Sequence, residues 1–302
     1  RGHALQRRPR GLLELHTMII SRWQALPWLA AFDQGVTELE TTLDLNKSRC
    51  MVALSEAGVQ LPEGPLVLWE AVKEVAEHDT GCFTINDDGT LERAYIFSPT
   101  TERAISLWGQ PEGAPTVLVA GFPMHRTKHV SPWEDTLKKI TACQPVSGRI
   151  LDTCMGLGYT AICAANSAAH VTVIEFDPGV EAMAARNPWS EPLFTRSNIT
   201  RKSGNAAALI KEFPNAAFDL IIHDPPTMQL AGDLYSGDFY RDATRVLSRR
   251  GRLFHYIGDP KSRHGATVTK GVVKRLHEAG FVAVTSAADA YAVVAWKEKP
   301  RR

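Results

Sequence analysis

The segment ILDTCMGLGYTAI, residues 150–162, joins a short apolar run to a predicted helix through a loop of small residues. The run ends in Asp152, and Gly156 and Gly158 follow with a G-x-G spacing. Glycine lets the backbone approach a ligand closely, and the start of a helix offers N–H groups that have no partner within the helix. NAD and nucleotide sites use similar loops, so this segment alone indicates a nucleotide-like ligand and no more.

Strand-like and helix-like patterns alternate from this segment to the end of the chain. Strands are predicted at 148–154, 170–176, 218–224, 251–258, 281–287 and 291–297. Such alternation is typical of a mostly parallel, doubly wound sheet with helices on both faces. The last two strands are too close together for a parallel crossover, so we expect the final strand to be antiparallel.

Polar residues follow successive predicted strands of this sheet. In open α/β sheets, ligands bind at the carboxyl ends of the strands. Glu175 comes twenty-three residues after Asp152, where an acid can accept hydrogen bonds from ribose hydroxyls. Asn205, in SGNAAALI, can present an amide to an adenine edge, and Asp224 ends the run FDLIIHD ahead of two prolines. Four strand ends therefore predict one ligand site.

These motifs together resemble the class I S-adenosylmethionine-dependent methyltransferases over about residues 131–297. DTCMGLG resembles their first motif, IEFDP their ribose-binding acid, GNA their adenine contact and HDPPT their fourth motif. The resemblance implies an α/β, Rossmann-like, doubly wound, seven-stranded sheet with an antiparallel last strand, and S-adenosyl-L-methionine as cofactor. The cofactor-binding residues that it implies are Asp152, Cys154, Gly156, Gly158, Glu175, Phe176, Asn205, Ala206 and Asp224.

A narrower resemblance rests on further motifs. MHRTK, SPWEDT, RNPWS, HDPP and LYSGDFY, together with DTCMGLGYTA, are similar to a family of predicted methyltransferases found widely in archaea. This match also includes the β-rich N-terminal part of the chain. One departure is Cys154, which stands where many relatives have glycine, and a small buried residue there preserves the turn.

The HDPPT loop resembles the D/N-P-P-Y/F/W loop of methyltransferases that modify amino groups of nucleic acids. In that loop the acid and the next carbonyl accept protons from an exocyclic amine, and the aromatic residue stacks on the base. The resemblance implies methyl transfer to an amine-type nucleophile, with a base of tRNA or rRNA as the leading acceptor. Thr227 replaces the aromatic residue, so the loop does not indicate which base is the acceptor. The implied catalytic residues are Asp224, Pro225, Pro226, Thr227 and Tyr235.

Candidate substrate-binding residues lie around the same sheet edge. His125 and Arg126 lie at the junction of two predicted domains, where a structural turn is the alternative interpretation, and Tyr256 ends the next strand. Lys261 and Arg263 belong to a loop that opens at the ligand edge, where they suit an RNA backbone or a small anionic substrate equally well.

A second reaction class has support in the sequence. GDLYSGDFYRDATRVLSRRG, residues 232–251, is similar to the L-(F/Y)-S-x-E-F-Y segment of aminopropyltransferases, which use decarboxylated S-adenosylmethionine on the same fold. Asp224, Asp233 and Asp238 are acids that suit a polyamine, although CMGLG departs from the usual GGGDG of those enzymes. Aminopropyl transfer, methylation of a small molecule and ligand binding without catalysis remain alternatives.

Composition bounds the class and the compartment. At 302 residues and 44% hydrophobic, the chain can form one large and one smaller domain. No apolar run approaches the roughly 20 residues that cross a bilayer, so we expect a soluble protein without a membrane partner. The five cysteines form no C-x-x-C pair, which argues against disulfides and against a metal site. We therefore expect an intracellular location, in the cytoplasm or an organelle such as the plastid.

The sequence divides into three predicted parts. Residues 1–37 carry five arginines and two acids, so we predict an arginine-rich, partly disordered arm or the remnant of a transit peptide. Short strands with turns between them predict a small mixed β domain at 38–125, with one helix at 66–77. A domain that binds the cofactor then spans 126–302, and it begins with a helix at 131–142 that Ser131 caps. Oligomeric state has no signal in the sequence.

Overall fold

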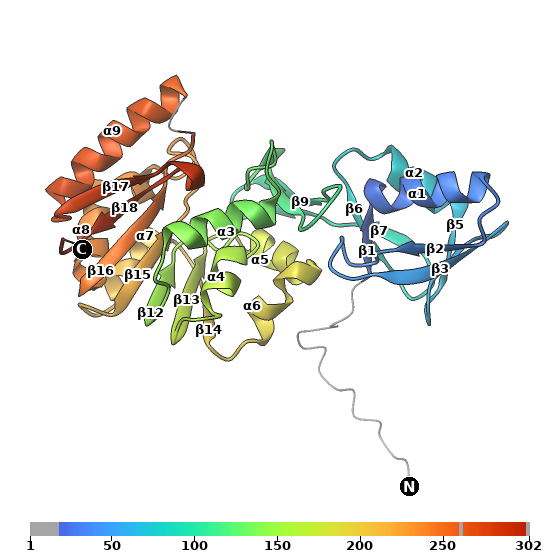
Figure 1. Cartoon of the computed structure of the whole chain (residues 1–302), viewed down its shortest axis with the longest axis horizontal. Coiled ribbons are helices and arrows are strands. Elements are labelled where there is room, and N and C mark those ends of the chain that lie inside the picture. The colour runs from blue at the N-terminus through green and yellow to red at the C-terminus, as the bar shows by residue number, and fades with distance from the viewer. Residues whose placement is uncertain (1–17, 260–261, 300–302) are drawn as a thin grey trace, which may run out of the picture.

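A computed structural model of the chain describes residues 18–259 and 262–299. Figure 1 shows a large sheet with helices on both faces in the C-terminal half, and a separate group of strands and two helices formed by the N-terminal residues. A small sheet that includes β9 lies between these two parts (Figure 1).

The large sheet has seven strands and the predicted α/β topology. Across the sheet the strands are β14 (Ile199–Ser203), β13 (His170–Glu175), β12 (Arg149–Asp152), β15 (Phe218–His223), β16 (Leu247–Tyr256), β18 (Ala292–Trp296) and β17 (Ala283–Ala287). The first five pair in parallel, whereas β18 runs antiparallel to both β16 and β17. The predicted fold class, including the antiparallel last strand, is confirmed.

Two apolar cores hold helices against the two faces of this sheet. One face is covered by α3 (Pro132–Ala142), α4 (Tyr159–Ala164) and α5 (Pro178–Ala185), and the other by α8 (Gly237–Val246) and α9 (Arg263–Glu278). Shorter helices are α6 (Glu191–Thr195) and α7 (Ala206–Leu209). The sheet is therefore buried on both sides, and its strand ends are left to form the ligand edge.

The predicted capping box of α3 is confirmed. The Ser131 hydroxyl accepts a hydrogen bond from the Glu134 N–H at 3.2 Å, and the Glu134 carboxylate accepts one from the Ser131 N–H at 2.9 Å. Because this box fixes where α3 begins, it also fixes which side chains of α3 face the sheet.

The N-terminal part has its own core. It contains β1 (Ile19–Ser21), α1 (Arg22–Asp33), β2 (Glu38–Thr41), β3 (Cys50–Ser55), β4 (Gly58–Gln60), β5 (Leu66–Leu68), α2 (Trp69–Glu77), β6 (Cys82–Ile85) and β7 (Leu91–Arg93). The predicted helix at 66–77 is a strand followed by a helix, because Leu66–Leu68 pair with β4.

The interpretation of residues 1–37 as an arm is wrong for residues 18–37. Ile20 and Trp28 are fully buried in the N-terminal core, and Ser21 forms a capping box with Gln24 at the start of α1. The arginines of this stretch suggested an arm, but its buried apolar residues decide its structure. Residues 1–17 lie outside the described residues.

A four-stranded sheet joins the two parts. It consists of β8 (Tyr95–Ser98), β9 (Arg103–Trp108), β10 (Thr116–Val119) and β11 (Phe122–Pro123). The Ser98 hydroxyl donates to Asp177 at the start of α5 at 2.6 Å, and the Trp189 indole donates to the Leu45 carbonyl at 2.9 Å. These contacts fix the N-terminal part against the half of the sheet that carries the glycine loop.

Candidate active site

The four predicted strand ends meet at one edge of the sheet. Parallel pairing places Asp152 of β12 between the end of β13, with Glu175, and the end of β15, just before Asp224. β14 pairs with β13 up to Ser203, and Asn205 follows two residues later. This confirms that residues scattered over seventy positions of sequence belong to one edge.

The glycine loop is held in shape by its neighbours. Gly156 has φ +53°, and its N–H donates to Glu175 Oε2 at 3.0 Å. Gly158 has φ +76°, and a Cβ at that position would lie 2.6 Å from Leu193 Cδ2. Ser190, from the RNPWS motif, donates to the Leu157 carbonyl at 2.7 Å. That motif therefore supports the loop rather than the ligand.

Gly158→Ala is expected to lower the free energy of unfolding by roughly 2–4 kcal/mol, because an L residue is strained at this φ and its Cβ meets Leu193. Gly232→Ala is the matched control, since a Cβ at Gly232 meets nothing within 4 Å. Urea denaturation of both variants measures the difference. Equal midpoints for the two variants would contradict this account of the loop.

Asp152 is buried at the end of β12. Its carboxylate accepts hydrogen bonds from the Thr160 hydroxyl at 2.6 Å and from the Cys154 N–H at 3.3 Å. Burial raises the pKa of Asp152 to about 7, against the opposing effect of these hydrogen bonds. Asp152 therefore links the strand, the loop and α4, and it titrates near neutral pH.

Glu175 and Phe176 lie at the end of β13, where nucleoside binding is predicted. The Glu175 carboxylate accepts hydrogen bonds from the backbone N–H groups of Gly156 and Asp177, at 3.0 and 2.9 Å, and a carboxylate has further acceptor sites for ribose hydroxyls. Burial raises the pKa of Glu175 to about 7. Phe176 is 50% exposed, and a Cβ at Gly156 would meet nothing within 4 Å, so a ligand can approach both.

Asn205 has a local role that the sequence motif did not reveal. Its side-chain oxygen accepts a hydrogen bond from the Ala207 N–H at 2.7 Å and caps α7. The neighbouring Ala206 is 4% exposed. The oxygen keeps a second lone pair and the amide nitrogen keeps its two donors, so Asn205 can still present both to an adenine edge.

Asp224 is paired with a buried lysine from α3. Lys139 Nζ lies 2.6 Å from Asp224 Oδ2 and 3.0 Å from Asp135 Oδ2, and its side chain is 2% exposed. Burial alone lowers the pKa of Lys139, but the Asp224 and Asp135 carboxylates outweigh it and raise that pKa above its ordinary value. Lys139 is therefore charged at neutral pH and fixes Asp224 in place.

The ion pair continues to the domain junction. Arg126 Nε lies 2.7 Å from Asp135 Oδ1, and the Arg126 guanidinium lies 4.1 Å from the centre of the Tyr291 ring. We name these four charged residues, Arg126, Asp135, Lys139 and Asp224, the charge chain. Nothing in the sequence indicates this role for Lys139 and Asp135, because an Asp–Lys pair four residues apart on a helix is normally solvent-exposed.

The proline loop is supported from below by Tyr235. The Tyr235 hydroxyl donates to the Pro226 carbonyl at 3.0 Å, and the ring is 5% exposed. Because its hydroxyl donates to the loop and its ring is buried, Tyr235 supports the proline loop, and the catalytic role predicted for it stays a prediction. Pro225 is buried, and Thr227 is exposed at the outer end of the loop.

A neutral histidine cluster packs behind this loop. His223 contacts the Thr153 hydroxyl through Nδ1 at 2.6 Å and the Leu234 carbonyl through Nε2 at 2.9 Å. Burial lowers the pKa of His223 to about 3, so the ring is neutral. His255 packs against it with ring centres 4.5 Å apart. These histidines belong to the core on the α8 face, opposite Tyr256.

The predicted substrate-binding residues divide into three groups. Tyr256 lies next to the charge chain, with its ring centre 4.6 Å from Lys139 Nζ. His125 is half-buried, with Nδ1 2.8 Å from the Thr116 hydroxyl, and burial lowers its pKa to about 3, which is compatible with a structural turn. Lys261 lies outside the described residues, and only the backbone of Arg263, at the start of α9, is described.

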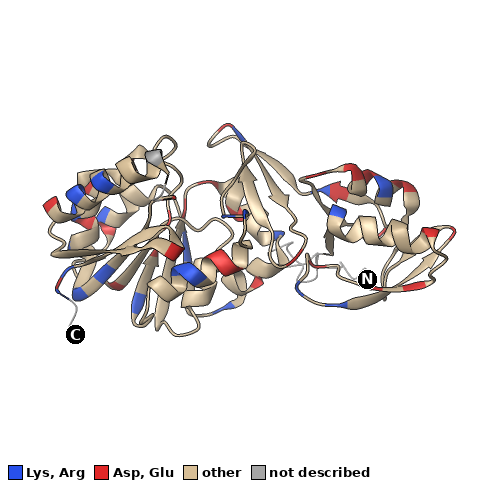
Figure 2. Ribbon diagram, turned by 45° about the horizontal axis from the view of Figure 1, so that its top comes forward, with Lys and Arg blue, Asp and Glu red and all other residues tan. Residues whose placement is uncertain are grey.

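Basic and acidic residues are mixed within residues 18–259 and 262–299. Figure 2 shows basic and acidic residues interspersed over both halves of the molecule. Arg252, from the basic stretch 241–275, is 7% exposed and donates to the carbonyls of Cys143 and Pro145. At least this arginine therefore has a structural role.

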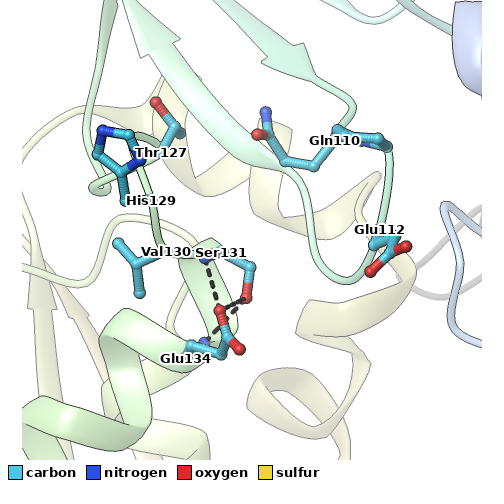
Figure 3. A pocket seen from close by; sticks show the side chains of 8 residues that line it. Gln110, Glu112, Thr127, His129, Val130, Ser131 and Glu134 are labelled. Atoms are coloured by element: carbon cyan, nitrogen blue, oxygen red, sulfur yellow. Dashed lines mark hydrogen bonds between the residues drawn. The ribbon is translucent and has the colours of Figure 1, made fainter.

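A pocket of about 300 Å³ lies apart from these residues, between the loop that follows β9 and the N-terminal end of α3 (Figure 3). Its lining consists of Gln110, Pro111, Glu112, Thr127, His129, Val130, Ser131 and Glu134. Glu134 is already used by the capping box. Since no strand-end residue lines this pocket, we assign it no part in the site.

Together, the strand order, the glycine loop and the polar strand ends define a Rossmann-like, doubly wound α/β fold with one predicted ligand edge. No protein-family model matches the sequence. The uncharacterized protein MJ1233 of Methanocaldococcus jannaschii is 41% identical over 268 residues, which cover 87% of this chain and 90% of that protein. The chain belongs to the same family as MJ1233.

Two further relatives match parts of the chain and have different activities. Polyamine aminopropyltransferase 2 of Streptomyces coelicolor is 32% identical over 120 residues, or 38% of this chain and 21% of that protein. Ribosomal RNA small subunit methyltransferase J of Pseudomonas paraeruginosa is 27% identical over 151 residues, or 47% of this chain and 53% of that protein. Both reaction classes predicted from the sequence therefore have a relative.

Solved structures agree on the fold. A spermidine synthase in complex with the transition-state analogue AdoDATO has a TM-score of 0.55 at 18% identity, over 72% of this chain and 76% of its own. The spermidine synthase of Thermotoga maritima has a TM-score of 0.53 at 17% identity, over 72% and 75% of the two chains. At these identities the likeness shows the fold alone.

Among residues 18–259 and 262–299, no helix is long and apolar enough to cross a membrane. Within the same ranges, no group of three or more His, Cys, Asp or Glu residues is arranged to hold a metal ion.

Proposed function

We propose that the chain is an S-adenosyl-L-methionine-dependent methyltransferase that acts on an amine-type nitrogen, with a base of tRNA or rRNA as the leading acceptor. One observation carries the proposal. Asp224, at the end of β15, is held by Lys139 Nζ at 2.6 Å, at the same sheet edge as Glu175 and Gly156. The predicted nucleoside cradle, formed by Glu175 and Gly156, and an oriented acid, Asp224, therefore lie at the same sheet edge.

The residues of this edge would divide the work as follows. Glu175 would accept hydrogen bonds from ribose hydroxyls, and Phe176 would pack against the base of the same ligand. S-adenosyl-L-methionine, when bound, supplies a methyl group attached to a positively charged sulfur. The acceptor nitrogen forms the new N–C bond with its lone pair while the S–C bond breaks, and Asp224 accepts the proton that the nitrogen loses.

The rRNA methyltransferase J relative supports an RNA acceptor, and the aminopropyltransferase relative favours a second candidate function, aminopropyl transfer to a polyamine. Lys139 weighs against that second candidate, because it already neutralises the acid that a polyamine ammonium would need. Asp238 does not replace it, since Asp238 is paired with Arg241 on the surface of α8.

Calorimetry with the two cofactors separates the candidates. We expect S-adenosyl-L-methionine to bind, and binding of the decarboxylated form alone would refute methyl transfer. A strain without the protein is then compared with wild type by mass spectrometry of RNA nucleosides and of polyamines. A missing methylated nucleoside supports the RNA acceptor, a missing polyamine supports the second candidate, and neither change directs the search to small molecules.

Cofactor affinity is expected to depend on pH. Asp152 and Glu175 both have a pKa of about 7, so each is about one-tenth ionised at pH 6 and nine-tenths ionised at pH 8. If binding requires a carboxylate, affinity rises about tenfold per carboxylate over this range and falls as pH drops through 7. Titration calorimetry at pH 6, 7 and 8 measures the slope. A flat profile would show that neither acid ionises on binding.

A further inference from the structure

We propose that Lys139, held by the rest of the charge chain, is a positioning residue that also sets substrate specificity. In this role it fixes the Asp224 carboxylate and rejects cationic amines, so the acceptor is an uncharged planar nitrogen compound that packs against Tyr256. This inference rests on the proposed methyl transfer and deepens it by naming the class of acceptor.

Asp224 lies beside Tyr256 at the ligand edge of the sheet. His223 of β15 and His255 of β16 are the last residues of those strands in register, so the next residues, Asp224 and Tyr256, are neighbours at the ligand edge. Lys139 Nζ contacts both, at 2.6 Å from Asp224 Oδ2 and 4.6 Å from the centre of the Tyr256 ring.

The charges at the site favour an uncharged acceptor. The charge chain contains two cations and two anions within direct contact, so it has no net charge to attract a polyamine. A second ammonium at Asp224 would also lie close to the ammonium of Lys139, which cannot move away because it is buried and held by Asp135. An uncharged amine avoids this repulsion and still finds Asp224 as an acceptor.

The shapes of the side chains around Asp224 favour a flat acceptor. The proline loop carries Thr227 where related loops have an aromatic residue, and Tyr256 supplies a half-buried ring on the adjacent strand. Tyr291 adds a second half-buried ring, whose centre lies 4.1 Å from the Arg126 guanidinium of the charge chain. Two aromatic side chains beside an acid suit a flat heterocycle better than a flexible chain.

Lys139→Met in the full-length protein tests the inference, with S-adenosylhomocysteine present in binding assays. We expect wild type to bind putrescine only in the millimolar range, and the variant to bind it at least tenfold more tightly. Methyl transfer to total RNA from a strain that lacks the protein should fall at least a hundredfold in kcat, while the Kd for S-adenosyl-L-methionine stays within threefold. Lys139→Arg should recover part of the activity.

Lys138→Met is the matched control, because Lys138 is the exposed neighbour on the same helix, and it should behave as wild type. If Lys139→Met does not fold, the double variant Asp135→Asn with Lys139→Met keeps the chain neutral through Arg126 and Asp224. A smaller putrescine gain than in the single variant is then expected, because only the repulsion by the Lys139 ammonium is removed. Tight putrescine binding by wild type, or unchanged kcat and putrescine affinity in the variants, would overturn the inference. Aminopropyl transfer by wild type would instead refute the proposed function.

Discussion

Asp224→Asn is expected to lower kcat for methyl transfer about a thousandfold, within the range that a positioned proton acceptor contributes. The asparagine keeps the shape of the side chain and one acceptor oxygen, but it removes the charge that Lys139 holds at 2.6 Å. Affinity for S-adenosyl-L-methionine should stay within a few-fold, because Glu175 and the glycine loop form the nucleoside cradle separately. Single-turnover assays and calorimetry measure the two quantities.

The matched control is Asp219→Asn on the same strand. Asp219 lies near the opposite end of β15, where its carboxylate accepts a hydrogen bond from the Arg149 N–H at 2.9 Å. It should affect stability without affecting kcat. If Asp224→Asn keeps more than a tenth of wild-type turnover, the proline loop is not the acceptor site.

Glu175→Ala should weaken binding of S-adenosyl-L-methionine about a hundredfold at pH 8. Two hydrogen bonds from ribose hydroxyls to a carboxylate contribute about 3 kcal/mol together, which corresponds to this ratio. The substitution also releases the Gly156 N–H, which Glu175 holds at 3.0 Å, so the glycine loop loses a fixed point. Calorimetry on the purified variant gives the Kd directly.

Glu181→Ala is the control for this change. Glu181 lies on α5, where it pairs with Arg201 at 3.1 Å and accepts a hydrogen bond from the Ser203 hydroxyl at 3.1 Å. Because both carboxylate oxygens are used within the fold, its loss should leave the Kd within threefold of wild type. A Glu175 variant with a Kd within threefold of wild type would mean that the ribose hydroxyls bind elsewhere. Stability of both variants is compared by thermal melting, so that unfolding is not mistaken for lost affinity.

Several features of the site could be predicted from the sequence because they depend on a few consecutive residues. Asp152, Glu175 and Asp224 each end an apolar run, and a strand end is a property of a few consecutive residues. Once the runs alternate with helices, parallel pairing brings those ends to one edge. The antiparallel β18 followed from the short connection between the last two predicted strands, whereas the order of the strands came from the structure.

Other features depended on partners far away in sequence. Tyr235 is predicted to be catalytic beside the proline loop, and only the structure shows that its hydroxyl donates to the Pro226 carbonyl beneath the loop. Ile20 and Trp28 looked like part of an arm because arginines surround them, and only the N-terminal core that they enter makes them structural. In each case a side chain's role was set by the contact it makes and not by its neighbours in the chain.

By itself, the sequence determined the sheet, the glycine loop and the order of the polar strand ends, because apolar periodicity and strand termini are written in adjacent residues. Only the tertiary structure decided the environment of Asp224, through Lys139 at a separation of 85 residues. A lysine on a helix is normally solvated, since burying an ammonium is costly without partners. The two carboxylates that offset this cost come together only when α3 packs against the ends of β15 and β16.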